Sequence, residues 1–178
     1  MSFRKYLNDY DLEEYVDKNG RTRRRAVYIG GYFVLHPPLS AVDRKLIPAL
    51  SVFSWIVLVG ALMPLSTASQ LWYAMLPLVF SGIPLFLMTG PSFILIMEDE
   101  KMTRERAERA SARLPLFSLI AGILSGIAFL GLITAAVIIR EDMLIGDLLF
   151  GILSLLLSAA TSFIYVKCRK IKPRLIDP

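Results

Sequence analysis

The sequence has one cysteine and one histidine in 178 residues. The single cysteine, Cys168, excludes an internal disulfide and a cysteine-based metal site. His36 has no second ligand near it, so we expect it to lie at the membrane interface rather than in a metal or catalytic site. Motifs of nucleotide-binding proteins, metalloproteases, serine hydrolases and paired intramembrane aspartates are also missing. We therefore expect no catalytic residues, no cofactor, no metal and no enzymatic activity.

Charged residues are absent from three long stretches, residues 46–97, 114–139 and 148–166. About 20 apolar residues cross a bilayer as a helix. The first stretch is long enough for two passes, with "PLSTASQ" (residues 64–70) as the turn between them. The pattern predicts an all-α integral membrane protein built as a four-transmembrane-helix bundle. The predicted spans are residues 46–65, 71–92, 114–139 and 143–166.

Positive charge is almost absent from one side of this predicted bundle. Of the 20 Lys and Arg residues, nine precede Leu46, five lie within residues 98–113 and five follow Val166, which leaves Arg140 on the other side. Basic loops stay in the cytoplasm. We therefore expect a cytoplasmic segment at residues 1–45, a cytoplasmic loop at 93–113 and a cytoplasmic basic tail at 167–178. Both termini would then be cytoplasmic.

The same layout is typical of a multi-pass protein of the bacterial inner (plasma) membrane. A polar segment precedes the first apolar stretch, so we expect no cleavable signal peptide. The formal charge of +5 is explained by the charge bias and by attraction to anionic lipid headgroups of the bilayer. It requires no nucleic-acid partner.

The segment before the first span predicts a small cytoplasmic β-hairpin element. In "FRKYLNDYDLEEYV", apolar and aromatic side chains share one helical face, which predicts a short amphipathic helix: Phe3, Tyr6, Leu7 and Tyr10. Asn19-Gly20 then predicts a hairpin, because both residues of a type I′ turn need positive φ. Pairing outward from this turn places Glu14 opposite Arg25. Gly30-Gly31 predicts a second turn, into a third strand at "YFVL".

"RTRRRA" within this hairpin is the densest positive charge in the chain. Arg23, Arg24 and Arg25 are candidate contacts for a phosphate-bearing ligand or an anionic lipid. The alternative is a solvated strand that also sets the topology. Alternation along a strand favours the alternative, since it turns Arg24 away from the other two.

Small residues recur every four positions in the third and fourth predicted spans. Such rows let helix backbones approach closely and form hydrogen bonds across the contact. The rows are Ser118, Gly122 and Gly126 in the third span, and Ser154, Ser158 and Ser162 in the fourth. Either the two rows pack on one another, or one of them forms the face of a homo-oligomer.

Three prolines lie seven residues apart in the second predicted span, at Pro77, Pro84 and Pro91. Seven residues fall about 20° short of two helical turns, so the prolines line one side of the helix. Each frees a backbone carbonyl, for which nearby hydroxyls are candidate donors: Ser81, Thr89 and Ser92. The line is either a pore or hinge, or the curved face of a packed helix.

Ionisable groups near the bilayer midplane are missing. Asp147 comes closest, and we expect it to reach the outer interface. A proton-coupled carrier needs a buried carboxylate, so this absence argues against secondary transport. Cys168, in "YVKCRK", has cationic neighbours that favour the thiolate. Palmitoylation is one interpretation, and the favoured alternative is an interfacial cysteine without a special role.

The inner loop, "EDEKMTRERAERASAR", pairs Glu100 with Arg104 and Glu105 with Arg109 at helical spacing. It predicts a helical extension leading into the third span and a candidate surface for a protein partner. We interpret the chain as a non-enzymatic accessory or scaffold subunit that acts through its cytoplasmic hairpin and this loop. The alternative is a small oligomeric channel or uniporter lined by the prolines of the second span.

Overall fold

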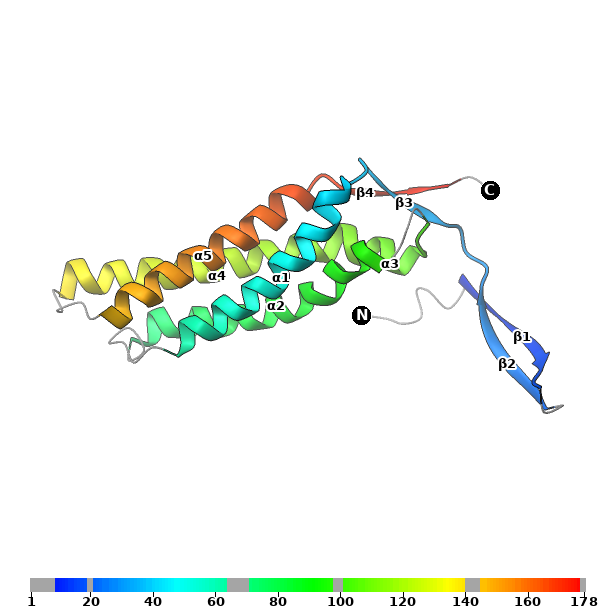
Figure 1. Ribbon diagram of the computed structural model, residues 1–178, viewed down its shortest axis with the longest axis horizontal. Helices are drawn as coiled ribbons and strands as arrows, with labels where there is room; N and C mark the ends of the chain where they lie inside the picture. The colour runs from blue at the N-terminus through cyan, green and yellow to red at the C-terminus, as the bar shows by residue number, and fades with distance from the viewer. Residues whose placement is uncertain (1–8, 19–20, 64–70, 98–100, 140–144, 177–178) are drawn as a thin grey trace.

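Four long helices make up most of the computed structural model, which describes residues 9–18, 21–63, 71–97, 101–139 and 145–176 (Figure 1). They are α1 (Ala41–Leu62), α2 (Trp72–Met97), α4 (Leu114–Thr134) and α5 (Ile145–Cys168). Within the described ranges, four helices are long and apolar enough to cross a membrane. The prediction of a mostly helical chain with four candidate spans is confirmed at this level.

The helices form a ring of antiparallel neighbours. Helix α1 packs on α2 and α5, and α4 packs on the same two helices. Successive helices run in opposite directions along the long axis, with the strands gathered at one end (Figure 1). This end, where α1 begins and α5 ends, is the basic end of the bundle. Ser40 caps α1 there, because its Oγ accepts a hydrogen bond from the Asp43 backbone N–H at 3.0 Å.

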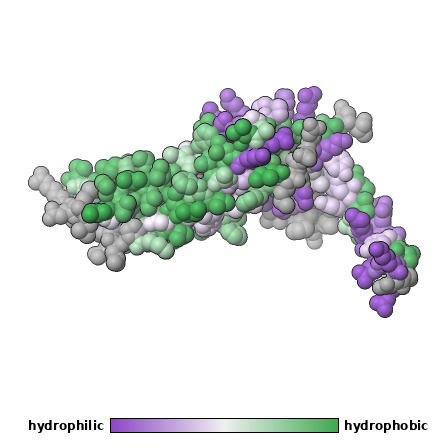
Figure 2. Space-filling model, viewed as in Figure 1, coloured by the Kyte–Doolittle hydropathy of each residue, from purple (hydrophilic) through white to green (hydrophobic). Residues whose placement is uncertain are grey.

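The side chains are distributed in the opposite way from a water-soluble bundle. Small hydroxyls are fully buried in the interior, and large apolar side chains cover the outside of all four helices (Figure 2). Ile56, Phe86 and Val137 are 66%, 72% and 70% exposed. Soluble monomers rarely expose a continuous apolar surface of this extent. Such a surface is compatible with a multi-pass membrane protein, whose outer side chains contact lipid.

The third predicted span continues a longer helical run. Helix α3 (Arg104–Glu108) and a π-helical turn η4 (Arg109–Arg113) precede α4, and a second π-helical segment η5 (Ala135–Ile139) follows it. The inner loop therefore does extend as a helix into this span. Arg109 pairs with Glu105, as predicted, whereas Arg104 pairs with Glu108 at 3.3 Å. Glu100 lies outside the described residues.

Strands β1 (Tyr10–Val16) and β2 (Thr22–Tyr28) form the predicted hairpin, but its register differs by one residue. Glu14 lies opposite Arg24, not Arg25. The Asp17 N–H bonds the Arg21 carbonyl at 2.9 Å, so three residues separate the last paired positions where the prediction had two. The predicted turn itself, Asn19-Gly20, lies outside the described residues. The amphipathic helix predicted for "FRKYLNDYDLEEYV" is also wrong over residues 10–16, which form a strand. Residues 1–8 lie outside the described part of the chain.

The predicted three-stranded meander is wrong as well. Strand β3 (Phe33–His36) pairs with β4 (Lys172–Leu175), a strand from the tail, and not with β2. Phe33 also exchanges backbone hydrogen bonds of 2.8 and 2.9 Å with Met102. The sheet buries Leu35, Met102 and Ile171 against the bundle. Burial of these apolar groups is the physical reason that β3 pairs there instead of extending an exposed hairpin.

Candidate functional site

The small residues of α4 and α5 meet in the bundle. The Ser158 hydroxyl donates to the Gly122 carbonyl at 3.0 Å, across the two helices. A Cβ at Gly122 would lie 3.1 Å from the hydroxyls of Thr161 and Ser162, and one at Gly126 would lie 3.5 Å from Ser158 Oγ. These positions of α4 therefore face the neighbouring helix α5.

The other members of the two rows are placed differently. Ser118 is buried, but its hydroxyl donates within its own helix, to the Pro115 carbonyl at 2.9 Å. Ser154 is buried with no hydrogen-bond partner among the described residues. The spacing rule missed close contacts at two other glycines. A Cβ at Gly131 would lie 3.1 Å from the Ala74 backbone of α2, and one at Gly151 would lie 2.7 Å from Leu132 of α4. Gly131 has a small residue at this spacing only at Ala135, and Gly151 has none, so neither belongs to a row of three.

The proline line runs along an unbroken helix. Pro84 and Pro91 are buried and Pro77 is half-buried. The hydroxyls expected to donate hydrogen bonds to the carbonyls freed by the prolines do not do so. Ser81, Thr89 and Ser92 instead bond the carbonyls of Leu78, Leu85 and Thr89, at 2.6, 2.7 and 2.7 Å. These bonds follow from helix geometry, because a hydroxyl reaches the carbonyl three or four residues back without strain.

A polar contact joins α1 to α2 beside this line. The Trp55 indole N–H donates to Thr89 Oγ1 at 3.0 Å, and the Ser51 hydroxyl lies 3.5 Å from the same atom. A Trp in a membrane helix needs such an acceptor, because lipid offers none at depth. Sequence reasoning missed the contact, since no spacing rule links residues on two different helices.

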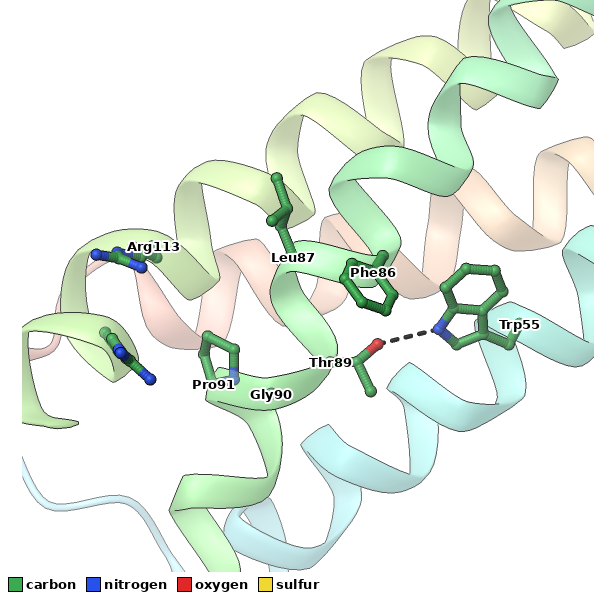
Figure 3. A pocket seen from close by; sticks show the side chains of 8 residues that line it. Trp55, Phe86, Leu87, Thr89, Gly90, Pro91 and Arg113 are labelled. Atoms are coloured by element: carbon green, nitrogen blue, oxygen red, sulfur yellow. Dashed lines mark hydrogen bonds between the residues drawn. The ribbon is translucent and has the colours of Figure 1, made fainter. Parts of the chain in front are cut away.

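An open groove of about 510 Å³ lies next to Thr89 (Figure 3). Residues of α1, α2 and η4 line it: Trp55, Phe86, Leu87, Thr89, Gly90, Pro91, Arg109 and Arg113. Figure 3 shows Arg113 at one end and Trp55 at the other, with Pro91 and Thr89 between them. The sequence offered Thr89 and Pro91 as site residues but gave no sign that the two arginines would join them.

The three arginines of the hairpin do not converge on one pocket. Arg23 lies 3.2 Å from Asp17 and Arg24 lies 2.8 Å from Glu14, on opposite faces of the strand pair. Arg25 lies opposite Glu13. Each of the three therefore has an acidic neighbour, which reduces what the cluster offers to a phosphate.

Two buried groups correct expectations. Asp147, expected to extend to the outer interface, is instead 1% exposed inside the bundle, near the start of α5, and it has an interaction partner within the chain. The argument against secondary transport that rested on the absence of a buried carboxylate is thereby weakened. Cys168 is fully buried and not at the surface, where palmitoylation would require its sulfur to be exposed. Its neighbour Lys167 turns away to pair with Asp43 at 3.0 Å.

Comparison of the chain with protein-family models, with curated proteins and with solved structures gives no match. Function must therefore be argued from the residues themselves. Within the described residues no group of three His, Cys, Asp or Glu side chains is arranged to hold a metal ion. The features that remain are the exposed hairpin and the groove beside α2.

Proposed function

We propose that this chain is an accessory or scaffold subunit of a membrane complex, that it has no catalytic role, and that it recruits its partner through the β1–β2 hairpin on the cytoplasmic side. The observation that carries the proposal is the hairpin's isolation. It extends away from the bundle (Figure 1), and all seven residues of β1 are exposed.

The hairpin has the composition of a docking surface. Leu12 and Val16 lie on one face and are 64% and 69% exposed, while Tyr15 on the other face is 45% exposed. A two-stranded hairpin alone is marginally stable in water. Covering its apolar side chains with a partner would stabilise the hairpin and the complex together. Its flanking Glu and Arg pairs would set the orientation of the partner.

The cytoplasmic orientation rests on charge. The strands and α3 lie at one end of the bundle (Figure 1), and on the face seen in Figure 2 the hydrophilic side chains gather towards that end while hydrophobic side chains cover most of the other described residues. The positive-inside rule assigns this end to the cytoplasm. The hairpin, α3 and the β3–β4 sheet would then all face cytoplasmic partners.

Site-specific photocrosslinking in native membranes tests the proposal. A photoreactive residue at Leu12 is expected to give a discrete adduct with another protein. The matched control places the same residue at Val137, which is exposed on the apolar surface of η5. If Leu12 yields only adducts of the chain with itself, or the same adducts as Val137, the subunit proposal fails.

The channel alternative has one supporting feature, a row of hydroxyls between α1 and α2 that includes Ser51 and Thr89. Its weakness is the burial of Pro84 and Pro91, because a pore between subunits would need that face on the outside. Flux of small solutes into vesicles containing the purified protein separates the two functions. A flux that Pro84→Ala alters would favour the channel.

A further inference from the structure

We propose that the groove beside α2 is a binding site for an anionic phospholipid. The phosphate would lie at Arg109 and Arg113, and the upper part of one acyl chain would lie along the apolar wall towards Trp55. This site is separate from the hairpin and does not depend on a protein partner.

The cationic end of the groove comes from one turn of helix. Arg109 and Arg113 begin and end η4, where the Leu114 N–H bonds the Arg109 carbonyl five residues back. Four-residue spacing sets both side chains on the same side of the helix. The eight lining residues include these two arginines and no acidic residue. Arg109 also pairs with Glu105 of α3, outside the lining, whereas its Nε has no hydrogen-bond partner among the described residues. Arginine is suited to phosphate because its planar guanidinium donates two parallel hydrogen bonds.

The rest of the groove is apolar and open to the side. Phe86 and Leu87 are 72% and 43% exposed, on the outer surface of α2. Thr89 lies eight residues before Met97, where the charge-free span ends. At the rise of an α-helix, Thr89 is therefore about 12 Å from the charged end of the span. The groove therefore runs from headgroup level into the acyl layer. A volume of about 510 Å³ accommodates a phosphate and part of one chain.

Gly90 keeps the groove open. A Cβ at this position would meet no atom within 4 Å, in contrast to Gly122 in the helix interface. A larger side chain at Gly90 would fill the groove without disturbing the packing of the bundle. This substitution would also leave both arginines in place, so it separates binding of the acyl chain from electrostatic attraction of the lipid headgroup.

Trp55 is a built-in reporter for the test. The chain has two tryptophans, so Trp72→Phe leaves Trp55 as the single tryptophan, which can be excited selectively above the absorption of tyrosine. The full-length protein is reconstituted in phosphatidylcholine vesicles that contain a small fraction of brominated phosphatidylglycerol or the same fraction of brominated phosphatidylcholine. Bromine atoms on the acyl chains quench the fluorescence of a tryptophan that they contact. We expect the anionic lipid to quench Trp55 with about fivefold higher apparent affinity.

Two variants and one control decide the outcome. Arg109→Gln with Arg113→Gln is expected to abolish the preference for the anionic lipid, and Gly90→Leu to reduce quenching by both lipids. Arg44→Gln with Arg169→Gln removes the same charge at the same end of the bundle and is expected to keep the preference.

Three results would overturn the proposal. The first is equal quenching by the two lipids in the parent protein. The second is an equal loss of preference in the Arg44 and Arg169 control. The third is a preference abolished by inorganic phosphate but not by chloride of the same ionic strength, since that would identify a site for a free anion.

Discussion

At the scale of single residues, the surroundings of a position decide its role more than the type of residue does. Gly122 and Gly90 are both glycines in apolar helices. One meets hydroxyls of α5 at 3.1 Å, and the other faces open space. The sequence predicts the first as a packing position because it belongs to a four-residue row. Nothing in the sequence predicts that Gly90 lines a groove.

Gly122→Leu should destabilise the bundle, because the new side chain would enter the contact with Ser158, Thr161 and Ser162. Overpacking of this kind costs about 1–3 kcal/mol. The measurement is unfolding of the purified protein in detergent. Gly90→Leu is the matched control and should leave stability unchanged. Equal losses for both would mean that α4 and α5 do not approach each other as closely as described.

Thr89→Val should cost about 1 kcal/mol, because it removes the acceptor of the Trp55 indole N–H. The same unfolding measurement checks it. Thr134→Val makes the matched comparison, since the Thr134 hydroxyl is exposed and bonds only within its helix. A Thr89→Val protein as stable as the Thr134→Val protein would show that the contact between α1 and α2 contributes nothing.

At the scale of elements, the sequence predicts local structure better than pairing. Charge-free runs locate the helices, and Asn19-Gly20 locates the hairpin, because these signals lie within one segment. The register of the hairpin depends on loop length, and a three-residue loop moves every pair by one. The partner of β3 lies more than 130 residues further along the chain. No local pattern could have shown that "KPRL" would pair with "FVLH".

The β3–β4 register predicts a disulfide. In a Cys168→Ala background, Val34→Cys with Arg174→Cys places two cysteines at directly opposite positions. Mild oxidation in membranes should link them efficiently, as shown by mass spectrometry of the resulting peptide pair. Val34→Cys with Lys172→Cys lies two positions out of register and should link poorly. The reverse order of yields would contradict the pairing.

At the scale of the whole molecule, polarity is arranged for a membrane. Hydroxyls are inside, apolar side chains are outside, and charge is concentrated at one end (Figure 2). The sequence predicts this arrangement almost completely, because composition alone separates the spans from the ends. The groove is different, since its lining combines α1, α2 and η4. Only the packing angles of three elements bring Trp55, Gly90 and Arg113 to one place.

Orientation in the membrane can be tested with thiol labelling. A single cysteine at Arg174, in a Cys168→Ala background, should react with a membrane-impermeant maleimide only after the cells are permeabilised. A single cysteine at Ala68, in the predicted outer turn, should react in intact cells. The unaltered chain should resist labelling in both conditions because Cys168 is buried. Labelling of the Arg174 cysteine in intact cells would reverse the topology.

The pairing of β3 with β4 has a consequence for biogenesis. One strand is synthesised before the first helix of the bundle and its partner only after the fourth, so the β3–β4 sheet cannot form while any span is still to be made. Until then β3 lacks the strand that pairs with it, although Phe33 can already bond Met102, which precedes α4. Closure of this small sheet therefore requires all four helices to have been made, and a chain that stalls midway through insertion would keep the β4-facing edge of β3 unpaired.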